Sequence, residues 1–228
     1  MAIRHTAYGF DAEQLAATVS TVAYKDAAFD AAALHRHAQE VFKSLRFDHP
    51  AHTGAFAGLR IDEERLFSTA IDEPEPHIDF LTLLCEHLVP APNLSQRIPM
   101  GYFVLQTALP SLGWSKSDIR AIVFGDPLAV LLAETLPHAV DAFPGFPEEC
   151  GWLSAEHCAG IVPSILDLIK MLDNPTGLIT SAFDALAGYA AERQSTPHAL
   201  LKGALFDALE MLEWSQTNQS DLFLLLEY

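Results

Sequence analysis

The strongest constraint on the fold is the spacing of apolar residues in the last third of the chain. After Ser154, which suits a helix N-cap, apolar side chains recur every three or four positions, as on one face of an α-helix. The stripe consists of Cys158, Ile161, Ile165, Leu168 and Leu172. A second helix is expected from residues 174–176 to about Arg193. A third opens at Thr196-Pro197 and runs to about Trp214.

The two ends of the chain predict a different element. Residues Ile3 to Phe10 suit a short extended segment, and Leu222 to Tyr228 are too few and too apolar for an exposed terminal helix. We expect the two segments to pair as buried strands. The predicted fold is therefore mainly α: a multi-helix globular bundle with a small β pair formed by the N- and C-terminal segments.

The first half of the chain carries further helix signals. Asp11 with Gln14 three positions later forms a capping box ahead of an apolar stripe. The dipeptide Asp126-Pro127 predicts another helix start, with Asp126 as the N-cap. Other helices are expected over residues 27–45, 77–88, 99–112 and 118–124, with a short helix or strand between 61 and 71.

Length and composition favour one domain. The chain has 228 residues, half of them hydrophobic and 19% charged, which is typical of a globular protein. A chain of this size buries roughly 70% of its unfolded surface, so its core needs no disulfide or metal. We expect a single domain over residues 1–228, with a possible subdomain seam in the loop 137–151, which holds three Pro and two Gly.

Net charge limits the partners that the chain can have. Thirteen Lys and Arg oppose thirty Asp and Glu, which gives −17. The second half is the more acidic. Nucleic acids and anionic membranes need basic surfaces, so both are unfavourable partners. A basic protein is the partner that this charge would attract, although acidity also serves solubility alone.

Several chemistries lack their usual motifs. Neither glycine-rich phosphate loop nor Gly-x-Ser-x-Gly is present, and no cofactor is expected. Three cysteines without framework spacing indicate reduced thiols, and Cys158 falls on an apolar stripe, where a small core residue is expected. No signal peptide or membrane-spanning run is recognisable, so we expect a cytoplasmic protein.

Residues 46–76 form the region most suited to a functional loop. They contain Asp48, His49 and His52, which offer a candidate metal site. Another group of metal-binding residue types lies at Cys150, His157 and Cys158. The alternative function is therefore a metal-dependent enzyme or sensor that uses His, Asp and Cys from 46–76 and 148–158. The acidic runs 62–64 and 72–75 are interpreted as solvated faces, because nothing around them would tune a catalytic pKa.

The last predicted helix suggests a docking face. Asp207, Glu210 and Glu213 recur every three residues, and Trp214 closes this stripe opposite the apolar one. We assign these four residues to partner binding, against the simpler interpretation of a solvated helix face. The general character is similar to that of bacterial toxin-immunity proteins. That similarity implies a non-enzymatic binding or regulatory protein that neutralises a basic partner through an acidic face. A purely structural subunit is the plainer alternative.

Overall fold

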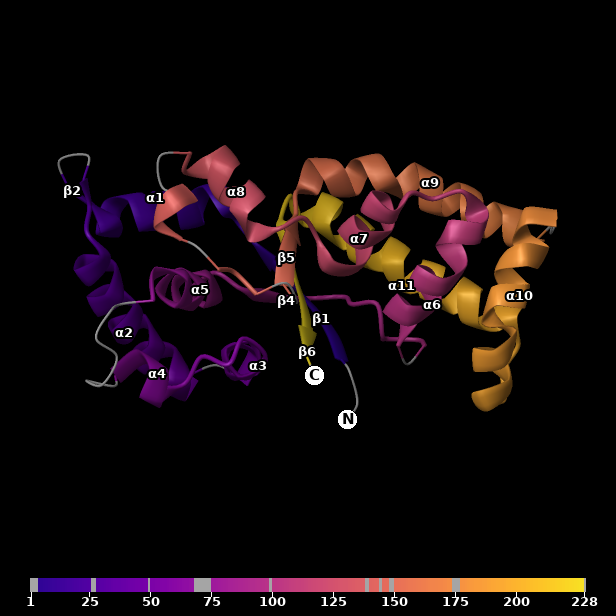
Figure 1. Ribbon diagram of the computed structural model, residues 1–228, viewed down its shortest axis with the longest axis horizontal. Helices are drawn as coiled ribbons and strands as arrows, with labels where there is room; N and C mark the ends of the chain where they lie inside the picture. The colour runs from indigo at the N-terminus through magenta and orange to yellow at the C-terminus, as the bar shows by residue number, and fades with distance from the viewer. Residues whose placement is uncertain are drawn as a thin grey trace.

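The computed structural model describes residues 4–25, 28–48, 50–67, 75–98, 100–137, 140–143, 145–147, 150–173 and 177–227. These residues form eleven α-helices, two short 3-10 helices and six strands. A four-stranded antiparallel sheet stands at the middle of the molecule with helices on both sides of it (Figure 1). The mainly helical fold with a small sheet is thus confirmed.

The terminal segments form the centre of the sheet. Strand β1 (Arg4–Phe10) pairs with β6 (Asp221–Glu227) along its whole length, from Arg4 opposite Glu227 to Phe10 opposite Asp221. The predicted pairing is confirmed, while Ile3 and Tyr228 lie outside the described residues. Two edge strands that the sequence did not predict complete the order β4-β1-β6-β5. They are β4 (Val89–Ala91) and β5 (Cys150–Leu153).

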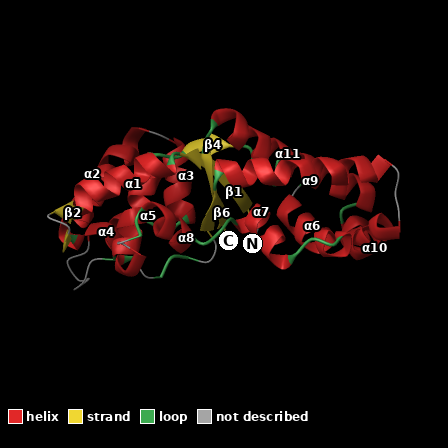
Figure 2. Ribbon diagram, turned by 90° about the horizontal axis from the view of Figure 1, so that it is seen from above, coloured by secondary structure: helices red, strands yellow, loops and turns green. Residues whose placement is uncertain are grey.

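Side chains along the two central strands point alternately to the two faces of the sheet, so they pack into the cores on both helical sides. Leu222 and Leu224 of β6 belong to one hydrophobic core, and Phe223 and Leu225 to the other. Successive side chains of a strand point to opposite faces, so a segment that is apolar at every position is what a sheet buried on both faces needs. Seen from above, the sheet separates the two groups of helices, and both chain ends lie beside it (Figure 2).

The first helical side contains six helices and a small hairpin. They are α1 (Ala12–Ala23), α2 (Ala31–Asp48), α3 (Pro50–Gly58), α4 (Glu63–Phe67), α5 (Pro76–Glu86) and α8 (Leu128–Thr135), with β2 (Tyr24–Lys25), β3 (Ala28–Phe29) and the 3-10 turn η2 (Val140–Ala142). The predicted short element between residues 61 and 71 is the helix α4. Helix α3 lies where the sequence predicted a loop.

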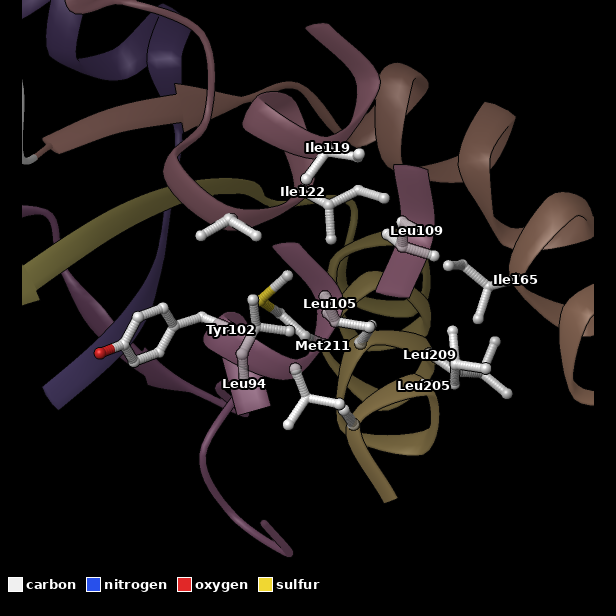
Figure 3. Close-up of a cluster of buried hydrophobic side chains, with 14 of the residues drawn as sticks. Leu94, Tyr102, Leu105, Leu109, Ile119, Ile122, Ile165, Leu205, Leu209 and Met211 are labelled. Carbon is white, nitrogen blue, oxygen red and sulfur yellow. The ribbon is translucent and has the colours of Figure 1, made fainter. Parts of the chain in front are cut away.

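The second side contains the remaining helices. They are α6 (Gly101–Ala108), η1 (Leu109–Leu112), α7 (Lys116–Phe124), α9 (Ala155–Asp173), α10 (Gly177–Glu192) and α11 (Pro197–Asn218). Figure 3 shows their core, in which Leu105, Ile122, Ile165 and Leu205 meet. The predicted start of α10 at 174–176 lies outside the described residues.

The chain passes between the two sides more than once. It crosses at β4, at residues 125–127 between α7 and α8, and at β5. The last crossing begins at Cys150, inside the segment 137–151 where a seam was predicted. Each side is therefore assembled from separate stretches of chain around one shared sheet. The assignment of residues 1–228 to one domain stays a prediction.

Three predicted N-caps are confirmed, and one is wrong. Asp11 accepts the Gln14 amide at 2.9 Å, Ser154 the His157 amide at 3.1 Å and Thr196 the Ala199 amide at 3.1 Å. Asp126 instead exchanges two backbone hydrogen bonds with Trp152, at 2.6 and 2.9 Å. This bridge holds Asp126 outside the helix, so α8 begins at Leu128 with Pro127 as its N-cap.

One carboxylate connects the two sides at the sheet. Asp221, the first residue of β6, accepts the amide of Ala12 at 3.2 Å and that of Ala155 at 2.9 Å. These amides belong to the first turns of α1 and α9, which lie on opposite sides. Burial raises the pKa of Asp221, while the two backbone hydrogen bonds act in the opposite direction. The first turns of both helices are thus anchored to the start of β6.

Candidate binding site

A pocket of about 530 Å³ opens on the first helical side, between residues of α2, α3 and α4. Three buried apolar side chains, Phe42, Phe56 and Ile61, form its floor. Three consecutive exposed acids form its rim. They are Asp62, Glu63 and Glu64, and Ala57 completes the lining. We call this feature the acid-rimmed pocket, and its three acids the rim.

The end of α3 builds part of the floor. Ile61 donates its amide to Phe56 O at 2.9 Å, and Arg60 donates to Ala57 O at 3.1 Å. This is the Schellman pattern of helix termination, with Arg60 in the left-handed region at φ 55°. The motif commonly brings together the two side chains that its longer hydrogen bond connects. Here they are Phe56 and Ile61, both of which line the pocket.

The start of α4 builds the rim. Asp62 Oδ1 accepts the Arg65 amide at 2.8 Å, so Asp62 caps the helix. Glu63 and Glu64 follow in the first turn. Acidic side chains are favourable at this end of a helix, because its free amides carry partial positive charge. Helix capping therefore explains why acids stand here, and the geometry places all of them beside an apolar depression.

Aromatic rings dominate the floor. The ring of Phe42 lies 4.9 Å from that of Phe56 and 6.1 Å from that of Phe67. Phe42 and Phe56 are each 5% exposed, so the floor is fixed by packing and presents only small ring areas to a ligand. The pocket thus offers an apolar, aromatic base and a negatively charged edge.

Two cations of this region already have partners. Arg65 binds Glu75 through Nε at 2.8 Å and Nη2 at 2.7 Å. The Lys43 amine lies 4.8 Å from the centre of the Phe67 ring. Because Arg65 is engaged by an acid outside the rim, it does not offset the charge of the rim directly.

A partly buried polar network holds α4 against α2 and α5. His35 Nδ1 lies 2.9 Å from Asp79 Oδ1, and Gln39 Nε2 lies 3.0 Å from His35 Nε2. Gln39 Nε2 also donates to Leu66 O at 2.6 Å. Since an amide nitrogen can only donate, His35 Nε2 must accept, and His35 Nδ1 must donate to Asp79. The proton arrangement follows from this geometry, and the network joins α2, α4 and α5.

The histidine–aspartate pair in this network does not resemble a catalytic base. A general base needs a ring nitrogen that can reach the substrate proton. Both nitrogens of His35 are occupied, one by Asp79 and the other by Gln39. We therefore interpret the network as the support of the pocket wall formed by α4.

The acidic stripe predicted on α11 is partly internal. Asp207 is fully buried, so its assignment to an exposed docking face is wrong. Its carboxylate accepts the Arg97 amide at 2.9 Å and the Arg97 guanidinium at 2.8 Å, with the Ile98 amide at 3.4 Å. Glu210 Oε2 lies 2.6 Å from Arg97 Nη2. Two of the predicted acids therefore fasten the segment before α6 to α11.

Glu213 and Trp214 have different positions from those acids. Glu213 is exposed, and Trp214 is half-buried and packs against the second core. A Cβ atom at Gly9 would overlap the Trp214 ring, so the indole lies directly on β1. The structure does not bring together all four predicted residues on one open face. Partner binding through Glu210, Glu213 and Trp214 stays a prediction.

The predicted metal site falls largely outside the described side chains. Asp48 is the last residue of α2 and His52 lies in α3, while His49 lies outside the described residues. In the second group, His157 lies 3.5 Å from Asp126, and Cys150 and Cys158 are buried. Among the side chains that the structure describes, no three His, Cys, Asp or Glu converge as metal ligands would.

Two of the cysteines are poor nucleophiles. Burial raises the pKa of Cys158 to about 11, and burial also raises the pKa of Cys85. A thiol in this state is rarely the reactive thiolate. The prediction that Cys158 is a small core residue is confirmed by its position in the second core.

Sequence reasoning found half of the acid-rimmed pocket. It singled out residues 46–76 and the acidic run 62–64, but it interpreted that run as a solvated face. It predicted the helix over residues 27–45, which contains Phe42, without connecting this helix to the acidic run. The signal that could have revealed the pocket is local. The helix-capping residue Asp62 is followed by Glu63 and Glu64, and it comes directly after Ile61, the apolar residue that follows the end of α3. Sequence reasoning also missed the pairing of His35 with Asp79.

No protein-family model, curated protein or solved structure matches this chain. Within the described ranges, every helix is too short or too polar to cross a membrane.

Proposed function

We propose that this protein is a non-enzymatic binding protein of the immunity type, which neutralises a basic protein partner. The acid-rimmed pocket is the observation that carries the proposal. It combines an apolar base with three adjacent carboxylates in a chain whose net charge is −17. Complementary charge steers two proteins together, and a desolvated apolar centre supplies most of the affinity.

The location of the pocket supports a docking role over a catalytic one. The rim acids are exposed on the surface, where a partner can reach them. The histidine beside Asp79 has both ring nitrogens engaged. These features suit recognition of charge and shape by a rigid helical surface.

The test is a pull-down with two charge-matched variants, at low and high salt. The rim variant replaces all three rim acids with amides: Asp62→Asn, Glu63→Gln and Glu64→Gln. The control variant removes three exposed acids elsewhere: Glu134→Gln, Asp184→Asn and Glu192→Gln. Asn at position 62 keeps a helix cap, so α4 should persist.

We expect one basic protein to be captured by the wild type and by the control variant. The rim variant should not capture it. Raising the salt concentration should weaken its capture, because exposed charges are screened. Recovery of no basic protein at either salt concentration would contradict the proposal. Equal recovery by both variants would contradict it as well.

A further inference from the structure

We infer that His35, Gln39 and the carbonyl of Leu66 form a proton-sensitive latch, which holds α4 while the His35 ring is neutral and loosens α4 when Nε2 takes up a proton. The latch consists of three contacts in a row: His35 with Asp79, Gln39 with His35, and Gln39 with Leu66 O. It concerns how α4 is held, so it needs no partner and goes beyond the proposed function.

The Leu66 carbonyl fixes the orientation of the Gln39 amide. The amide atom that lies 2.6 Å from Leu66 O must be a donor, because two acceptor oxygens would repel each other at this distance. That atom is therefore Nε2. It also lies 3.0 Å from His35 Nε2, to which it can only donate. A ring nitrogen that accepts carries no proton, so this arrangement requires a neutral ring.

Asp79 directs a second proton to Nε2 of the ring. His35 Nδ1 donates to Asp79 Oδ1 at 2.9 Å, while Oδ2 of the same carboxylate is buried and finds no donor among the described residues. Asp79 therefore needs the Nδ1 proton whether the ring is neutral or charged. A further proton has to bind at Nε2, where it would face the Gln39 amide as donor against donor.

A turn of the Gln39 amide removes this conflict and releases the bond to α4. With Oε1 towards His35 the amide accepts the new proton, but the same oxygen then faces Leu66 O, which loses its donor. The Arg65–Glu75 pair at 2.7 Å and the buried Leu66 side chain also attach α4, so it should loosen without unfolding. Histidine is the side chain that changes charge near neutral pH, which makes the latch responsive to mild acid.

Other charged groups around the latch belong to the elements that pack against α2. Glu75 precedes α5 and adds negative charge near Asp79, and Arg65 of α4 pairs with it. His77 of α5 lies 4.0 Å from Glu75, and α4 also carries rim acids. Glu13 is exposed in the first turn of α1, and residues 54–58 of α3 contain no titratable side chain. All of these groups lie outside the three contacts, so the proton on Nε2 is the change that acts on the bond to α4.

The test follows the whole protein by NMR between pH 8 and pH 5. The ring nitrogen signals of His35 report whether Nε2 carries a proton. Hydrogen exchange of the Leu66 amide, which donates to Asp62 O at 3.2 Å, reports how firmly α4 is held. As His35 becomes charged, the protection factor of this amide should fall roughly threefold to tenfold, as expected for the loss of one hydrogen bond. The side-chain amide signals of Gln39 should shift with the same midpoint.

Variants separate the latch from a general effect of pH. Gln39→Met removes the amide but keeps a side chain of similar length, and Gln39→Asn, whose amide is too short to reach both acceptors, is the milder version. Both should show the low protection in either state of His35. His37→Gln is the matched control, because it removes a histidine of the same helix whose ring lies 3.7 Å from Glu40, and it should keep the response. An unchanged methyl signal of Ile165, in the second core, shows that each variant is folded.

Three results would overturn the latch: equal protection of the Leu66 amide in both states of His35, a pH response that survives Gln39→Met, or a ring whose Nε2 is protonated at pH 8 or still unprotonated at pH 5. Loosening of α4 should also weaken capture of the basic partner in mild acid, a consequence that rests on the proposed function. Failure to find such a partner would contradict the proposed function and leave the latch intact, whereas partner capture without the protection change would do the reverse.

Discussion

His35 Nδ1 lies 2.9 Å from Oδ1 of Asp79, and this contact joins α2 to α5 beneath the acid-rimmed pocket. The Asp79 side chain is 1% exposed. Burial raises the pKa of Asp79, the His35 hydrogen bond opposes that change, and the charge of Glu75 adds to the rise. Of the described residues, His35 is therefore the one that makes a buried carboxylate tolerable here.

Replacing His35 with Ala should destabilise the protein by about 3 kcal/mol at pH 7, because a buried carboxylate would lose its donor. Urea unfolding measures the change. The stability lost on replacing His35 with Ala should become smaller as the pH falls. A group with a raised folded-state pKa binds its proton more readily in the folded state, so it favours folding at acid pH, and that contribution is lost as pH rises.

The charge of Asp79 can be removed separately as a control. Asp79→Asn keeps an acceptor for His35 Nδ1 without the buried charge, so it should cost less than His35→Ala. Equal losses from the two variants, or a His35→Ala deficit that does not change with pH, would contradict the assigned roles.

His5 should make stability depend on pH with the opposite sign. It is completely buried, with Nε2 donating to Val123 O at 2.9 Å and Nδ1 accepting from the Leu94 amide at 3.3 Å. Burial lowers its pKa from 6.5 to about 4. Between these values the unfolded chain binds more protons, so stability falls as pH drops from 6.5 to 4, by about 3 kcal/mol.

Chemical denaturation of wild type and His5→Gln across this range isolates the effect. Glutamine can donate and accept but does not titrate, so the difference between the two proteins should diminish as pH falls. Contributions from Asp79 and Asp221, whose raised pKa values act in the other direction, cancel in the comparison. A constant difference from pH 7 to pH 4 would refute the role of His5.

Asp207 should matter far more for stability than Glu213, the exposed acid of the predicted stripe. Asp207→Ala leaves the Arg97 and Ile98 amides without their acceptor and should cost about 3 kcal/mol in urea unfolding. Arg97→Ala should cost about 1 kcal/mol, since its backbone amide still binds Asp207 and its side chain is 47% exposed. Glu213→Gln, at an exposed position, should change little. A similar loss from Asp207→Ala and Glu213→Gln would contradict the buried placement.

Replacing Gln194 with glycine should stabilise the protein. It ends α10 in the left-handed region at φ 52°, where its amide binds Ala191 O and the next amide binds Ala190 O. A residue with a Cβ atom is strained there, so Gln194→Gly should gain about 0.5–1 kcal/mol in thermal or urea unfolding. The matched substitution Ala187→Gly, at an exposed position inside the same helix, should lose about 1 kcal/mol. Destabilisation by both variants would argue against this helix end.

The sequence predicted those helices and strands that patterns of neighbouring residues specify. The apolar segment at residues 222–228 could hardly be an exposed helix, and it forms β6 at the centre of the sheet. Strands β4 and β5 have three and four residues and contain Pro90 and Gly151, so they show no alternation. They form because they pair with the outer edges of β1 and β6. Helix ends were also hard to place, because Arg60 and Gln194 occupy positions where glycine is the usual signal.

Contacts between distant residues explain what the sequence could not predict about the sites. Asp207 falls on an acidic stripe with period three, yet Arg97, 110 residues earlier, covers it. The reverse holds at the acid-rimmed pocket. The run 62–64 was visible as charge, but its meaning depends on Phe42, which α2 brings from another part of the chain. A helical period shows which residues share a face and leaves open what packs against that face.

The measurement that bears most directly on the acid-rimmed pocket is a charge-matched comparison of affinity for the purified basic partner. The rim and control variants both change the net charge from −17 to −14, by removal of three carboxylates. If the pocket is the docking site, the rim variant should bind about tenfold more weakly or worse, and the control variant within about twofold of the wild type. Equal affinities for the two variants would mean that diffuse charge, and no particular place on the molecule, attracts the partner.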